Sequence, residues 1–111
     1  MPTINKGQDV LTFINVFTVA PDSQEKLVAL LVEAAQQTMR HLPGFVSSNV
    51  HRSLDGITVV NYAQRKSMAD FQAMRRNPEA AAHIEAVAAL GTFNATLCEV
   101  AETIEAFSEA A

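Results

Sequence analysis

The sequence predicts an α+β fold with the element order β-α-β-β-α-β and one antiparallel sheet. Runs rich in β-branched and aromatic residues alternate with stretches in which apolar residues recur at helical spacing. Capping or turn residues stand at nearly every junction between these segments. This order is the ferredoxin-like arrangement. The 111 residues have the length of a single domain, 1–111, and a chain of this length can bury a core without disulfides.

The first predicted elements are a strand and a long helix. Residues 11–19, LTFINVFTV, favour a strand because β-branched and aromatic side chains dominate them. Asp22 and Glu25 then form a capping-box pattern, after which the apolar spacing predicts a helix to about His41. The Pro-Gly pair at 43–44 ends this helix, because both residue types are typical of helix termini.

The rest of the chain predicts a hairpin, a broken helix and a last strand. The Asp-Gly pair at 55–56 indicates a hairpin turn, and Asn77 followed by Pro78 indicates that one helix ends and another begins. The predicted elements are strands at 45–53 and 57–65, a helix from Ser67 to about Arg76, a helix at about 78–90 and a strand within 95–104. We expect a polar arm, 1–10, and a tail, 105–111, to flank the core at about 11–104.

The composition excludes several classes of function. The 8 Lys and Arg residues against 12 Asp and Glu residues give a formal net charge of −4, which argues against binding a nucleic acid. No apolar run is long enough to cross a membrane. The single cysteine, Cys98, cannot form an intramolecular disulfide and favours a reducing, cytoplasmic compartment. His41, His51 and His83 show no metal-ligand spacing, and no nucleotide-binding or nucleophile-elbow motif occurs.

The predicted hairpin strands are apolar on both faces. Helices cover only one face of such a sheet, and a hairpin with two apolar faces needs cover on both. Apolar side chains alternate along the two strands at Val46, Val50, Val60 and Tyr62. The simplest cover for them is a second copy of the same sheet, and we therefore expect a homodimer that packs face to face.

The hairpin turn decides which polar side chains share a face of the sheet. A two-residue turn places His51 opposite Val60 and points Asn61 to the other face. A three-residue turn with a left-handed glycine places His51 opposite Val59 and Asn49 opposite Asn61. The Asp-Gly pair suits either turn. We favour the three-residue turn, because it gathers four polar side chains around an apolar floor: Asn49, His51, Asn61 and Arg65.

A sheet face of this composition, lying beneath helices, forms a mostly apolar pocket with a few convergent polar groups. Asparagine and histidine in strand interiors oppose β-propensity, which favours a functional reason for the cluster. The alternative is that each polar side chain pairs with backbone groups or reaches solvent at the rim.

The stretch GFVSSNVHRSLDGITVVNYAQRKSMADF resembles the antibiotic-biosynthesis monooxygenase family of dimeric α+β barrels. In element order the resemblance spans about 11–104. It is sharpest in the Pro-Gly-Phe segment at 43–45, in His51, in the Asp-Gly pair and in the run VVNYAQ at 59–64. That run is most similar to actinorhodin-type monooxygenases, which oxidise polycyclic anthrones to quinones with dioxygen and without a cofactor.

The resemblance implies a role for each pocket residue. In the family, a strand asparagine that matches Asn61 holds the keto or enolate oxygen of the substrate. A histidine that matches His51 lies near the pocket, where it would act as a base or proton shuttle. Arg65 stands where the family usually has a tryptophan and would add a positive field, and Phe71 stands where a tyrosine is usual. The implied catalytic residues are thus Asn61 and His51, and the implied substrate-binding residues are Asn49, Arg65, Phe71 and Asn15.

Two alternative functions remain open from the sequence. Asn15 and His83 resemble the distal asparagine and the proximal haem-ligating histidine of haem-degrading relatives on the same fold, which would make haem the cofactor. The other alternative is a non-catalytic, dimeric module that binds a small molecule. The leading interpretation is a monooxygenase that needs no cofactor and no metal, with a small hydrophobic or aromatic substrate and dioxygen.

Overall fold

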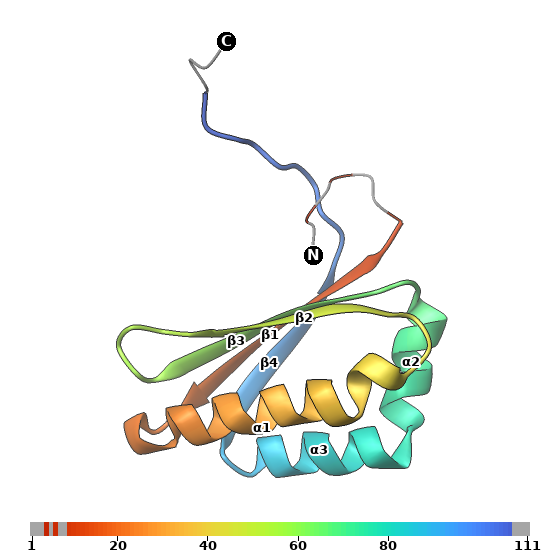
Figure 1. Ribbon diagram of the computed structural model, residues 1–111. Coiled ribbons are helices and arrows are strands. Elements are labelled where there is room, and N and C mark those ends of the chain that lie inside the picture. The colour runs from red at the N-terminus through yellow and green to blue at the C-terminus, as the bar shows by residue number, and fades with distance from the viewer. Residues whose placement is uncertain (1–3, 5, 7–8, 108–111) are drawn as a thin grey trace.

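Four antiparallel strands form one sheet, and the helices lie on one side of it (Figure 1). The computed structural model describes residues 4, 6 and 9–107 of the chain. The strands are β1 (Leu11–Val19), β2 (Phe45–Arg52), β3 (Thr58–Arg65) and β4 (Gly91–Cys98), in the spatial order β2-β3-β1-β4. The helices are α1 (Gln24–Gln37), α2 (Met68–Arg76) and α3 (Pro78–Ala88), with 3₁₀ turns η1 (Pro21–Ser23) and η2 (Met39–His41). The predicted α+β class and ferredoxin-like order are confirmed.

The core lies between the sheet and the helices, and it has two parts. One part joins the middle of the sheet to α1 and α3, and Leu27 and Val59 are fully buried within it. The other part joins α2 and the start of α3 to the start of β1, where Phe71 and Met74 pack near Phe13. Between them, the two clusters hold α1, α2 and α3 against the same face of the sheet (Figure 1).

Local capping explains where two of the helices begin. The Ser67 hydroxyl accepts from the Asp70 N–H at the start of α2, and the Asn77 side chain accepts from the first N–H groups of α3, as predicted. The predicted cap at Asp22 is wrong. Asp22 lies in the turn η1, and Ser23 precedes α1 without a capping hydrogen bond from its side chain.

The last strand is shifted from its predicted position. Strand β4 begins at Gly91, directly after α3, and ends at Cys98, whereas the prediction placed it within 95–104. Gly91 allows this early start because a Cβ there would meet the carbonyl oxygen of Thr18 on β1. After β4 the chain leads away from the sheet to residue 107 (Figure 1). Parts of the predicted arm and tail, 1–3, 5, 7–8 and 108–111, lie outside the described residues.

The hairpin between β2 and β3 has a four-residue loop, which overturns the favoured three-residue turn. The Ser53 N–H donates to the Thr58 carbonyl at 2.9 Å, and the Ser53 hydroxyl accepts from the Thr58 N–H. His51 therefore lies opposite Val60, the same register that a two-residue turn would give. Gly56 does have a left-handed conformation, with φ +83°, but it lies inside the larger loop.

This register sorts the apolar hairpin residues differently from the prediction. Val60 lies on the face of the sheet away from the described helices, as does Tyr62. Val50 lies on the helix-covered face instead, where it packs against the buried core around Leu27. Val46 falls in a β-bulge between Phe45 and Ser47, outside the regular pairing. The expectation that all four residues share one face is wrong.

We expect Gly44→Ala to destabilise the fold more than Gly56→Ala. Both glycines have φ +83°, which costs an alanine about 1–2 kcal/mol. A Cβ on Gly44 would also overlap the Asp70 side chain, adding about 1–3 kcal/mol, whereas a Cβ on Gly56 would meet no other atom. Urea unfolding measures both differences. Equal losses in the two variants would show that Asp70 moves aside at no cost.

Candidate active site

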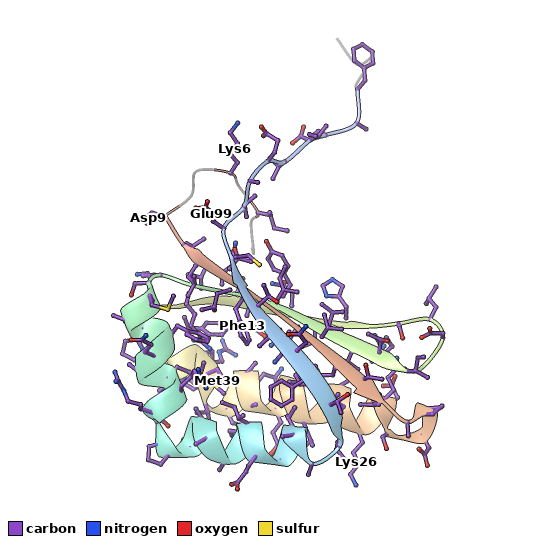
Figure 2. All side chains as sticks on the ribbon, turned by 180° about the vertical axis from the view of Figure 1, so that it is seen from behind. Lys6, Asp9, Phe13, Lys26, Met39 and Glu99 are labelled. Carbon is purple, nitrogen blue, oxygen red and sulfur yellow. The ribbon has the colours of Figure 1, made fainter. Side chains whose placement is uncertain are left out.

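A cavity of about 240 Å³ lies between the sheet and the helices. Its wall is mostly apolar, and in Figure 2 Phe13 of β1 and Met39 of η2 lie in this space between the layers. The volume approaches the range of small-molecule sites, which begins at roughly 300 Å³. The polar and charged residues of the wall come from β1, β2, β3, α2 and α3: Asn15, Ser48, Asn61, Arg65, Arg75 and His83.

Two asparagines form the polar centre of the sheet-side wall. Asn15 and Asn61 are directly opposite each other on β1 and β3, so their side chains leave the same face of the sheet. The Ser48 hydroxyl donates to Asn61 Oδ1 at 2.8 Å, which leaves the amide nitrogen of Asn61 as a donor. Asn15 Oδ1 is buried and has no hydrogen-bond partner among the described residues. The pair therefore offers both donors and an acceptor to a bound molecule.

Arg65 is a buried cation at one end of this wall. Its side chain is only 5% exposed, and the guanidinium carbon lies 5.5 Å from the centre of the Phe45 ring on the neighbouring strand. Nε and Nη1 have no hydrogen-bond partner within the described part of the chain. Burial lowers the pKa of Arg65, and the negative charge of Asp70 opposes part of that shift. The guanidinium nevertheless stays charged, because its ordinary pKa is so high.

His83 reaches the cavity from α3, and its ring contacts Thr38 at the end of α1. The His83 Nε2 atom lies 3.0 Å from the Thr38 hydroxyl, which in turn lies 3.4 Å from the Glu79 carboxylate. Glu79 precedes His83 by one helical turn, so both project from the same side of α3. A carboxylate only accepts hydrogen bonds, so the Thr38 hydroxyl donates to Glu79 and accepts from His83 Nε2–H. This network assigns the free lone pair of the ring to Nδ1.

Aromatic rings line the end of the cavity near α2. Phe13 and Phe71 pack with their ring centres 5.2 Å apart and their planes inclined by 46°. The Arg75 guanidinium carbon lies 5.9 Å from the centre of the Phe71 ring. Arg75 itself is exposed on α2. Tilted rings of this kind present both edges and faces to a planar ligand.

The structure brings together only part of the predicted site. Asn61, Arg65, Phe71 and Asn15 line the cavity, as does His83. His51 and Asn49 do not, because the hairpin register places them on the opposite face with Val60 and Tyr62. There the Asn49 amide donates to the Tyr62 carbonyl at 3.0 Å, and the exposed His51 ring lies 3.1 Å from the Asn49 carbonyl. The prediction that these two residues share the pocket with Asn61 is wrong.

Four polar residues of the site were missed from the sequence: Ser48, Arg75, Thr38 and Glu79. Because of the one-residue shift in register, Val50 takes the place opposite Asn61 that was predicted for Asn49, and Ser48 faces the cavity opposite Ala63. Thr38 and Glu79 act on the cavity only through His83. The four-residue spacing between Glu79 and His83 is a sequence signal that could have identified Glu79. The contact with Thr38 joins residues 45 positions apart and leaves no local pattern.

The described part of the chain gives no support for a metal site, for a membrane-spanning helix or for haem ligation through His83 Nε2. No cluster of three or more His, Cys, Asp or Glu side chains is arranged to hold a metal ion there. None of the described helices combines the length and the apolar character that crossing a bilayer requires. His83 does not fit haem ligation through Nε2, because that atom is engaged by the Thr38 hydroxyl.

The fold and the cavity define a small α+β protein with a mostly apolar pocket for an organic ligand. Residues 11–86 match the model of the family described as antibiotic biosynthesis monooxygenase. The chain is also 42% identical over 108 residues to tetracenomycin-F1 monooxygenase from Streptomyces glaucescens, covering 97% of this chain and 96% of that protein. The chain therefore belongs to the antibiotic biosynthesis monooxygenase family, and the resemblance stated from the sequence is confirmed.

Solved structures of related proteins share the fold. The monooxygenase from the gene ActVA-Orf6 of Streptomyces coelicolor, in complex with nanaomycin D, superposes with a TM-score of 0.84 and 30% identity. That match covers 96% of this chain and 100% of the other. SnoaB from Streptomyces nogalater, described as a cofactor-independent oxygenase, has a TM-score of 0.69 and 30% identity, over 86% of this chain and 97% of the other.

Proposed function

We propose that this protein is a cofactor-independent monooxygenase that uses dioxygen to oxidise an enolisable aromatic substrate of the anthrone type to a quinone. The observation that carries the proposal is the placement of Asn61 on the wall of an apolar cavity, with its amide oxygen held by Ser48 and its nitrogen left to donate. The similarity to tetracenomycin-F1 monooxygenase and to SnoaB supports the same reaction class.

The reaction places few demands on the protein. The CH₂ group that lies across the central ring from the anthrone carbonyl loses a proton, and the resulting enolate, conjugated through the fused rings to the carbonyl oxygen, is electron-rich enough to reduce dioxygen directly. Oxygen adds to that carbon, and the peroxide loses water to leave a second carbonyl, so that one anthrone and one O₂ give one quinone and one H₂O. The protein binds the rings, excludes water and stabilises the enolate oxygen.

The proposed roles follow from the geometry of the cavity. Asn61 donates to the enolate oxygen, and the Asn15 amide lies beside it on the next strand. His83 replaces His51 as the proposed proton acceptor, since it reaches the cavity with Nε2 engaged by Thr38 and Nδ1 carrying the lone pair. Phe71 packs against the substrate rings.

Oxygen uptake tests the proposed function. The protein is mixed with anthrone and with hydroxylated anthrones in buffer treated with a chelator, while an electrode follows dioxygen and absorbance follows the quinone. We expect one O₂ consumed for each quinone formed, above the rate without protein. Binding of these compounds without oxygen uptake would instead support the non-catalytic binding module.

We also propose that the protein forms a homodimer through the sheet face that carries Val60 and Tyr62. No described helix covers that face, and Val16 on it is 39% exposed. The three apolar side chains form part of a surface that a second copy would bury. A cytoplasmic location, proposed from the single cysteine, Cys98, accords with a protein that needs no disulfide.

Val60→Lys is expected to disrupt the dimer. A lysine there would place an unpaired charge in the apolar interface, where removing it from water costs several kcal/mol. The unchanged protein should elute with a mass near twice 12.0 kDa in size-exclusion chromatography with light scattering, and the variant near 12.0 kDa. Val32→Lys, on the exposed side of α1, should remain dimeric. A wild-type monomer at micromolar concentration would refute the proposed dimer.

A further inference from the structure

The charge of the cavity is opposite to that of the whole protein. The chain carries a formal net charge of −4, yet none of the acidic residues in the described part of the chain lines the cavity. The cavity wall instead contains Arg65, Arg75 and a histidine. A cavity that concentrates positive charge in an acidic protein attracts an anion in preference to a neutral molecule.

Arg65 is the residue on which this charge depends. Arg65 is only 5% exposed, and two of its three guanidinium nitrogens have no hydrogen-bond partner among the described residues. The two ion pairs of the described residues, Lys6–Glu102 and Arg52–Glu25, do not involve it. Asp70 affects it only through its field, and the Asp70 carboxylate accepts from the Ser67 hydroxyl at 3.0 Å.

A buried, unpaired guanidinium is costly, so proteins rarely keep one without a partner. The ring of Phe45 compensates through its face, but a ring offers no hydrogen-bond acceptors in the plane of the guanidinium. The partner that fits this planar set of donors is a carboxylate, which can accept two parallel hydrogen bonds.

We propose that the substrate is an aromatic acid whose carboxylate pairs with Arg65, at the end of the cavity near Phe45. This inference rests on the proposed function for the aromatic part of the substrate and deepens it by naming the anionic group. Asn61 and Arg65 lie on the same face of β3, four positions apart, and Ala63 lies between them on that face. The carboxylate and the enolate oxygen therefore bind at separate places along β3.

Binding of a matched pair of probes tests the proposal without any turnover. Anthracene-2-carboxylate and its methyl ester share the same rings and differ in the charge, and their fluorescence reports binding. We expect the protein to bind the acid about 10- to 100-fold more tightly than the ester, as for a hydrogen bond between charged groups. Arg65→Met should remove this preference, because methionine fills similar space without the charge.

Matched variants distinguish Arg65 from other sources of positive charge. Arg76→Met, on the exposed side of α2 and away from the cavity wall, should keep the preference for the acid. Arg65→Lys should keep only part of it, since a lysine supplies the charge without the planar donors. Loss of the preference in Arg75→Met with its retention in Arg65→Met would overturn the assignment, as would equal binding of both probes or binding of neither at millimolar concentration.

A second measurement needs no ligand. If Arg65 has no partner in the free protein, Arg65→Met should leave the melting temperature unchanged or raise it, because an unpaired buried charge is removed. A fall of several degrees would show that Arg65 is paired within the protein and would overturn the proposal. Failure of the oxygenase assay with intact acid preference would refute the proposed reaction and leave the carboxylate site standing.

Discussion

Asn61→Ala is expected to lower kcat for an anthrone by about 10²- to 10³-fold, the usual effect of deleting one donor to a developing oxyanion. KM should change less, because the donor acts most strongly on the enolate that forms during the reaction. Steady-state oxygen uptake with anthrone measures both constants. The loss is expected to persist at saturating substrate.

The matched control for this variant is Asn94→Ala. Asn94 is also an asparagine in a strand, but it lies opposite Val16 on the other face of the sheet, which is the face proposed for the dimer, so light scattering is used to check that the variant remains dimeric. It should leave kcat unchanged. If Asn61→Ala turns over as fast as the unchanged protein while it remains folded, the enolate oxygen does not bind at Asn61 and the proposed orientation of the substrate is wrong.

His83→Gln is expected to lower kcat by about 10²- to 10⁴-fold, the range contributed by a positioned proton acceptor. Glutamine has a similar size and can still contact Thr38, but it cannot accept a proton at neutral pH. Thr38→Val should lower kcat by less, since it keeps the imidazole and removes only the hydroxyl that orients it. Both variants are assayed by oxygen uptake.

Raising the pH separates a proton acceptor from a merely structural histidine. At a pH at which anthrone ionises in solution, the enolate arrives already formed and no base is required. His83→Gln should then approach the rate of the unchanged protein, whereas Asn61→Ala should remain slow. A His83→Gln variant that stays slow at every pH would show that His83 supports the shape of the cavity instead of accepting the proton.

The sequence predicted the fold well because each element carries its own local signals. Alternating β-branched residues, a serine cap before α2 and the Asn-Pro junction before α3 all act within a few residues, and the structure confirms them. The prediction placed β4 too late in the chain, because the residues directly after Gly91 include polar side chains and give only a weak strand signal. The start of β4 is determined by its pairing with β1, which is not a local signal.

The site was predicted in part, and the errors share one cause. Asn61 and Arg65 were found because their own strand alternates regularly. Asn49 and His51 were assigned to the wrong face because their position depends on the number of residues in the loop, and Gly56 suits several loops. The local hydrogen bonds of Ser53 and Asp55 stabilise a four-residue loop, and the sequence pattern of the turn did not reveal them.

The β-bulge at Val46 has a consequence for comparing and redesigning proteins of this kind. Phe45 and Ser48 both face the cavity although their numbers differ by three, because the bulge reverses the alternation between them. An alignment that counts steadily along β2 from the Pro-Gly pair will therefore assign every residue beyond the bulge to the wrong surface. A designer who wishes to widen the cavity from this strand should choose odd positions before Val46 and even positions after it, whereas deletion of Val46 would restore regular alternation and leave Phe45 and Ser48 on the cavity side.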